Sequence, residues 1–244
     1  YAEAFDPDRD AVLSALPAAG VGLVLCPGCD LDTSRQSIQL AEAYPHVYAA
    51  AGVHPEDALG LPVDWLDQVA EMTRHPKVKA IGEIGLDYYW KEVPRDLQKE
   101  VFRAQLQLAK VLDLPVIVHD REAHADCLAI VREFPGVRGV FHCYSGSAED
   151  AKTLVKLGWH LSFTGTITFK NARKAPEVIA AVPLERIMVE TDAPYMAPTP
   201  FRGKRCDSRY VYRMVETIAE IKGLTPAEVE QATTENGKAL FAIP

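Results

Sequence analysis

Short apolar runs alternate along the chain with longer segments in which apolar residues recur every three or four positions. Runs rich in Val, Ile, Leu and Ala and bounded by Gly or Pro are typical of strands buried on both faces of a parallel sheet. We predict roughly seven such strands. They fall at residues 21–26, 47–53, 78–82, 114–118, 137–141, 159–163 and 186–190.

The segments between these runs have helical periodicity. Residues 96–112 carry an apolar stripe at spacings of three and four, which predicts an amphipathic helix. A further helix is predicted at residues 7–16. Near the C-terminus, Thr225 is followed by a Pro at the first helical position and by Glu228, which predicts a helix start with a capping Thr.

Regular alternation of strand and helix predicts a parallel sheet, and no Pro-, Gly- or Ser-rich linker interrupts it. We therefore expect one α/β domain over residues 1–244, folded as a (β/α)8 TIM barrel. Such a barrel has about eight strands, so the predicted set is one short. Because the chain opens directly into a helix, we expect the first strand to lie upstream of Tyr1.

Composition narrows the class of protein. Of the 244 residues, 48% are hydrophobic and 25% are charged, with a net charge of -8. No apolar run approaches the roughly 18 residues needed to span a bilayer, so we expect no membrane association. The negative net charge disfavours electrostatic binding of nucleic acid over the whole surface. Five scattered cysteines and no visible secretory signal favour the cytoplasm.

Polar residues that can bind metal or transfer protons follow five of the predicted strands. The carboxyl ends of barrel strands open on one face, so these side chains are expected to converge. A single His at a strand end is usually a hydrogen-bonded loop residue, but repetition at equivalent positions favours a metal site. The residues are His54, Glu83, His119, His142 and Asp192.

Two imidazoles and two carboxylates suit Zn²⁺, Mn²⁺ or, with added water, Mg²⁺. We expect Glu83, His119, His142 and Asp192 to be the ligands. Glu83 has a longer side chain than Asp192 and could bridge two ions. Asp192 could accept the proton of a nucleophilic water, so these two carboxylates are the candidate catalytic groups.

A phosphate substrate would need positive charge near such ions. Arg121 lies two positions after His119 and could donate to phosphate oxygens, and His54 is a second candidate. Arg202, Lys204 and Arg205 form a basic loop that could hold another phosphate or could be a solvated turn.

Tyr88, with the neighbouring Tyr89 and Trp90, could stack on an unpaired base; core packing is the competing interpretation. The spacing of Cys26 and Cys29 is that of redox pairs, but Cys26 closes a predicted strand and does not begin a helix, which disfavours that role.

The chain resembles the TatD family of metal-dependent deoxyribonucleases over nearly its whole length. The motifs that carry the resemblance occur in order along the chain. They are Gly52-Val-His-Pro55, Ala80-Ile-Gly-Glu-Ile-Gly-Leu-Asp-Tyr-Tyr89, Leu114-Pro-Val-Ile-Val-His119, Gly139-Val-Phe-His-Cys-Tyr-Ser-Gly146, Val189-Glu-Thr-Asp-Ala-Pro-Tyr195, Arg202-Gly-Lys-Arg205 and Thr234-Glu-Asn236.

The resemblance implies a TIM-barrel hydrolase with two divalent ions, Mg²⁺, Mn²⁺ or Zn²⁺. It implies that Glu83 bridges them, that His119 and His142 hold one ion, and that Asp192 holds the other beside the hydrolytic water. It also implies 3'-5' exonuclease action on single-stranded DNA. We predict no obligate protein partner. The family's His-x-His pair on the first strand is absent here, and we expect it upstream of Tyr1.

Two other functions remain open. A metal-dependent amide or ester hydrolase would use the same barrel and ions, although such enzymes often carry a carboxylated Lys where Glu83 stands, which favours the nuclease by analogy. A catalytically dead barrel that only binds its ligand is the second alternative.

Overall fold

The computed structural model describes residues 1–244 and alternates strands with helices throughout. Its contacts group the residues into two compact units, which are described separately. The first unit comprises Leu23–His142 with Tyr1 and Leu240–Ile243. The second comprises Ala2–Gly22 and Cys143–Ala239 with Pro244.

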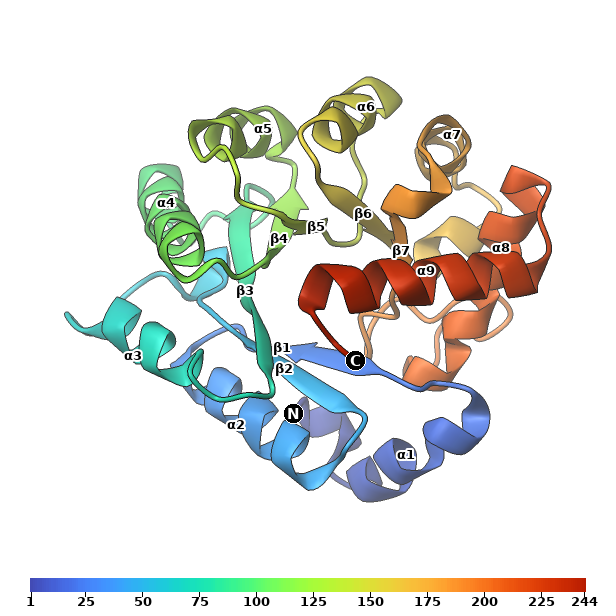
Figure 1. The fold of residues 1–244 in the computed structure, drawn as a ribbon, viewed down its shortest axis with the longest axis horizontal. Helices are drawn as coiled ribbons and strands as arrows, with labels where there is room; N and C mark the ends of the chain where they lie inside the picture. The colour runs from blue at the N-terminus through green and yellow to red at the C-terminus, as the bar shows by residue number, and fades with distance from the viewer. The chain divides into compact units, whose positions relative to one another are not determined.

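The first unit holds five parallel strands that pair in chain order. Helices lie outside these strands (Figure 1), as the predicted alternation of elements requires. The strands are β1 (Val24–Pro27), β2 (Val47–Ala51), β3 (Val78–Asp87), β4 (Val116–Arg121) and β5 (Gly139–Phe141), and the helices are α2 (Leu31–Ala43), η3 (Pro55–Asp57), α3 (Trp65–Met72), α4 (Arg95–Leu112) and α5 (His124–Glu133).

Strand β3 is longer than the sequence predicts, and this changes where Glu83 lies. We expected the strand to end at residue 82, with Glu83 just beyond it; that expectation was wrong, because pairing with β4 continues to Asp87. Ile81 pairs with Val116 and Ile84 with Val118, so two residues of β3 stand opposite one of β4. This irregularity is a β-bulge, a feature that re-aims side chains. Glu83 therefore projects from inside a strand.

His119 also lies inside a strand, because β4 continues to Arg121. Gly85 of β3 faces it in the register. The φ of Gly85 is +142°, and a Cβ there would lie 2.0 Å from the carbonyl oxygen of His119. Only glycine permits this close approach of the two strands.

Helix α4 matches the predicted amphipathic helix closely. It buries a face that includes Val101, Phe102 and Leu106. Two glutamines on the same face, Gln98 and Gln105, are also buried, and both bond to backbone groups outside the helix. Buried amides require such partners, so their position on the inner face indicates a specific structural role.

The second unit holds two parallel strands, β6 (His160–Phe163) and β7 (Ile187–Val189). With the five strands above, the predicted number of seven is confirmed. Its longer helices are α1 (Arg9–Ala15), α6 (Ala148–Lys156), α7 (Lys174–Ala181), α8 (Tyr212–Lys222) and α9 (Pro226–Phe241), and its short ones are η1 (Glu3–Phe5), η2 (Pro17–Ala19), η4 (Gly165–Thr168), η5 (Leu184–Arg186) and η6 (Ser208–Val211).

The predicted start of α9 is confirmed. The amide of Glu228 donates to Oγ1 of Thr225 over 3.3 Å, and the amide of Thr225 donates back to Glu228 over 2.8 Å. Further along the helix, the side-chain amide of Asn236 donates to the carbonyl oxygens of Leu184 and Ile187, which ties α9 to the start of β7.

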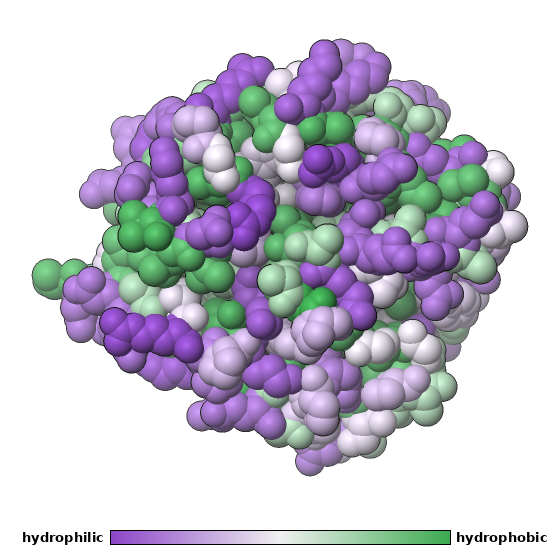
Figure 2. Space-filling model, in the orientation of Figure 1, coloured by the Kyte–Doolittle hydropathy of each residue, from purple (hydrophilic) through white to green (hydrophobic).

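Figure 2 shows hydrophilic side chains over most of the visible face, with apolar side chains in small groups among them. Scattered exposed apolar residues of this kind are ordinary for a folded chain. None of the helices combines the length and the apolar composition that a membrane crossing requires.

Candidate metal centre

One oxygen of Glu83 is the focus of a buried cluster in the first unit. Its Oε1 atom lies 2.7 Å from Nε2 of His142, 2.8 Å from Nδ1 of His119 and 3.5 Å from Nε2 of His54. The side chains come from β3, from β4 and from the loops after β5 and β2. Four residues that are distant in sequence therefore converge on one point, as the strand pattern predicts.

Hydrogen bonds to the backbone fix Glu83, His142 and the residue before His54. The amide of Glu83 donates to the carbonyl oxygen of Gly28 over 2.8 Å, and the amide of His142 donates to that of Val118 over 3.0 Å. Gln105 bonds both backbone groups of Val53, the residue before His54, through its amide oxygen (2.8 Å) and nitrogen (2.9 Å). The cluster is thus held by hydrogen bonds from strands and from helix α4, and not by loop packing alone.

Burial and charge act in opposite directions on the carboxyl of Glu83. Burial alone would raise its pKa, but the charge of His142 and hydrogen bonds from His119, His142 and His54 hold the pKa well below its usual range. For His119, burial opposes the charged form, while hydrogen bonds to Asp87 and Glu83 raise its pKa. The carboxylate of Glu83 is therefore ionised and surrounded by imidazoles.

This donor set fits a divalent cation. One ligand atom each from His54, Glu83 and His119 lie within 4.8 Å of one another, all on largely buried side chains. Imidazole nitrogen with carboxylate oxygen is the ligand chemistry of Zn²⁺ and Mn²⁺. The sequence assigned His54 to phosphate and not to metal; the structure brings it to the same group as Glu83 and His119.

Asp87 is a site residue that the sequence analysis did not identify. It is fully buried, and its Oδ2 atom lies 2.9 Å from Nε2 of His119. The sequence could have indicated it, because residues 83, 85 and 87 share one face of a strand, which places Asp87 on the same face as Glu83. It was missed because the strand was expected to end at residue 82.

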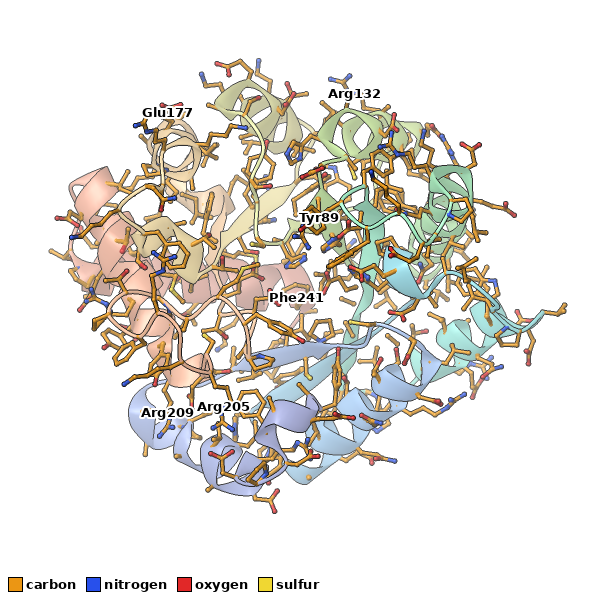
Figure 3. The ribbon with its side chains drawn as sticks, turned by 180° about the vertical axis from the view of Figure 1, so that it is seen from behind. Tyr89, Arg132, Glu177, Arg205, Arg209 and Phe241 are labelled. Atoms are coloured by element: carbon orange, nitrogen blue, oxygen red, sulfur yellow. The ribbon has the colours of Figure 1, made fainter.

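The aromatic segment after β3 divides into a buried and an exposed part. Tyr88 is 8% exposed, and its hydroxyl donates to Asp126. Tyr89 and Trp90 are 47% and 46% exposed, and Tyr89 lies at the end of β3 (Figure 3). The guanidinium of Arg121 lies over the Tyr89 ring, 3.9 Å from its centroid. The exposed aromatic surface beside the cluster is thus made by Tyr89 and Trp90.

The other candidate residues belong to the second unit. Asp192 follows β7 and has a positive φ of 54°. Arg205 forms two contacts of 2.7 Å with the carboxylate of Asp8 and lies over the ring of Phe5. Figure 3 places Arg205 next to Arg209, beside α1.

The remaining basic residues of this loop differ in their contacts. The guanidinium of Arg202 lies over the ring of Phe169, 4.0 Å from its centroid, and Lys204 is exposed. Because Arg205 is already paired with Asp8, Arg202 and Lys204 are the more accessible cations of the loop.

All five cysteines have free thiols. Burial, together with the nearby charge of Glu83, raises the pKa of Cys29 to about 12. A thiol with such a pKa is a poor nucleophile at neutral pH. This agrees with the expectation that Cys26 and Cys29 do not act as a redox pair.

Comparison with known proteins gives consistent matches. The family model of the TatD related DNases matches residues 1–242. The metal-dependent hydrolase YabD of Bacillus subtilis is 44% identical over 244 residues, which cover 99% of this chain and 96% of the relative. The protein of Citrobacter rodentium named 3'-5' ssDNA/RNA exonuclease TatD is 33% identical, with 98% of this chain and 94% of the relative covered.

A solved structure shows the same fold. The crystal structure of YjjV, a TatD homologue from Escherichia coli K12, superposes with a TM-score of 0.93 at 34% identity and covers all of this chain and 95% of its own. The fold and the cluster define an α/β TIM-barrel hydrolase that depends on metal. The chain belongs to the family of TatD related DNases.

Proposed function

We propose that this protein hydrolyses phosphodiester bonds at the ends of single-stranded nucleic acid, removing nucleotides in the 3'-5' direction with two divalent ions, Mg²⁺, Mn²⁺ or Zn²⁺. The relatives named 3'-5' ssDNA/RNA exonuclease support this direction and substrate. The observation that carries the proposal is the Glu83 oxygen shared by His119 and His142, with Arg121 two residues further along β4.

In this proposal, Glu83, His119 and His142 hold an ion, and His54 either completes the ligand set or contacts the phosphate. When bound, a divalent ion lowers the pKa of water to about 7 and offsets negative charge on the phosphate. The ionised carboxylate of Glu83 provides charge for the ion, and the buried imidazoles fix its position. Asp192, predicted from the sequence as a ligand and proton acceptor, keeps that proposed role.

Substrate binding is proposed for the surface beside the cluster. The guanidinium of Arg121 lies over the Tyr89 ring, and its N–H groups could fork onto phosphate oxygens. Tyr89 and Trp90 offer exposed rings on which unpaired bases could stack. The burial of Tyr88 favours its two neighbours for this role.

The net charge of -8 favours short contacts with strand ends over wrapping of a duplex. We place the protein in the cytoplasm because its cysteines are all free, as is typical of reducing compartments. No obligate protein partner is required by the proposal.

The direct test is cleavage of a single-stranded oligonucleotide by the full-length protein with Mg²⁺, Mn²⁺ or Zn²⁺. A substrate labelled at its 5' end should give a descending ladder, and one labelled at its 3' end should release labelled mononucleotide at once. The reverse pattern would contradict the direction. Acyl-amino acids and lactones serve as the parallel panel, because cleavage of these and not of DNA would favour an amide or ester hydrolase.

A further inference from the structure

We propose that Asp87 is a positioning residue that couples the ligand His119 to the exposed aromatic turn at Tyr89 and Trp90. Each of its two carboxylate oxygens serves one of these partners. The inference rests on the proposed function for the roles of ligand and stacking surface, but the contacts that define it stand on their own.

The first oxygen sets the orientation of His119. Oδ2 of Asp87 lies 2.9 Å from Nε2 of the imidazole. An ionised carboxylate can only accept a hydrogen bond, so Nε2 carries the proton and donates it. The other ring nitrogen, Nδ1, faces Oε1 of Glu83 at 2.8 Å. Asp87 therefore fixes the orientation of the ring, with Nε2 toward itself and Nδ1 toward the cluster, the arrangement that metal-binding histidines use.

The second oxygen holds the aromatic turn. Oδ1 of Asp87 accepts hydrogen bonds from the backbone amides of Tyr89, at 2.9 Å, and Trp90, at 3.1 Å. An aspartate that bonds the amides two and three residues ahead stabilises a turn. This turn presents the Tyr89 ring to Arg121 and leaves both aromatic rings half exposed.

The backbone of Asp87 is itself fixed, so its carboxylate is not free to serve one partner without the other. Gln98 of α4 accepts from the amide of Asp87 and donates to its carbonyl oxygen, both at 2.9 Å. On the other side, Asp87 pairs with Arg121 in the β3–β4 register. A rigid, fully buried carboxylate thus links the two sites.

Two substitutions separate the halves of the proposal. In Asp87→Asn, the backbone amides of Tyr89 and Trp90 can still donate to the remaining side-chain oxygen. The new NH₂ group takes the place of the oxygen that accepts from His119, so that hydrogen bond is lost. We expect the affinity for Zn²⁺ or Mn²⁺, measured by calorimetry, to fall by about 10–100-fold. Hydrogen exchange at the amides of Tyr89 and Trp90 should stay slow. In Asp87→Ala both properties should be lost, with amide exchange roughly tenfold faster.

Asp113→Asn is the matched control, because Asp113 is exposed at the end of α4 and contacts Arg138. It should leave metal affinity and exchange unchanged. Wild-type metal affinity in Asp87→Asn would overturn the first half of the proposal. Unchanged exchange in Asp87→Ala would overturn the second.

A measurement on the unaltered protein covers the case in which the variants do not fold. Nitrogen NMR of ion-free protein above about pH 8 should show His119 protonated at Nε2. Protonation at Nδ1 alone would overturn the proposal. None of these readouts uses nucleic acid, so failure to cleave DNA would count against the proposed function and not against the role of Asp87.

Discussion

Nε2 of His142 lies 2.7 Å from Oε1 of Glu83, and Nδ1 of His119 approaches the same oxygen to 2.8 Å. A single carboxylate oxygen thus joins the loop after β5 to the middle of β4. The substitution Glu83→Gln removes its negative charge while keeping its shape. We expect bound metal and cleavage rate to fall at least about 100-fold, since losing even an outer partner of a metal ligand costs 10–100-fold.

Metal content by mass spectrometry of the purified protein checks this prediction, together with the cleavage assay. Glu100→Gln on the exposed face of α4 is the control. Normal metal content in Glu83→Gln would remove Glu83 from the ligand set.

Tyr89→Ala should weaken binding of single-stranded oligonucleotides without changing the rate at saturation. Stacking on an aromatic side chain contributes about 1–3 kcal/mol per base, so Kd should rise roughly 5- to 150-fold. Fluorescence anisotropy with a phosphorothioate oligonucleotide measures the change. Tyr212→Ala is a matched control, because Tyr212 is 46% exposed and also has an arginine near its ring. Equal effects of the two substitutions would argue against a specific stacking surface.

Gly85→Ala should destabilise the protein and disturb the cluster. The added Cβ would meet the carbonyl oxygen of His119 at 2.0 Å, so the strands must separate. Overpacking of this kind costs about 1–3 kcal/mol, and a positive φ adds strain. Chemical denaturation measures the loss, and metal affinity should fall with it. Gly22→Ala, where a Cβ meets nothing within 4 Å, should change stability by less than about 0.5 kcal/mol.

Gln105→Leu should destabilise the protein more than the small change in side-chain volume suggests. The change leaves the amide and the carbonyl of Val53 buried without their partner, at about 1–3 kcal/mol each. Because His54 follows Val53, we also expect weaker metal binding. Gln107→Leu, on the exposed face of the same helix, should be nearly neutral. Denaturant unfolding of both variants gives the comparison, and equal losses would contradict the role of the buried amide.

The carboxylate of Asp126 should contribute to stability only above its titration range. Its pKa is lowered by the hydrogen bond from Lys99 and then by the hydroxyl of Tyr88. A folded-state pKa below the unfolded value gives stability that is present above the unfolded pKa and lost as pH falls through the folded one. The difference in denaturant midpoint between wild type and Asp126→Asn should therefore shrink below about pH 4. A difference that is independent of pH would contradict this.

Local sequence signals predicted the elements well and the cluster in part. The capping Thr225 and the apolar stripe of α4 were correct because both depend on neighbouring residues in the chain. The expected length of β3 was wrong because Gly82 resembles a strand end in sequence, whereas β3 continues past it and its Gly85 allows close contact with β4. Asp87 was missed for the same reason. The burial of Tyr88 was not predictable either, since it depends on a distant partner, Asp126.

The two buried glutamines of α4 lie seven positions apart, which places them on one face and about 10 Å apart along the axis. One bonds the end of β3 and the other the segment after β2. The helix therefore sets the distance between the end of β3 and the segment after β2. Inserting or deleting one residue between Gln98 and Gln105 would turn one amide by about 100° away from its target. The length of this helical segment is fixed by the cluster it supports, while its outer face is free to vary.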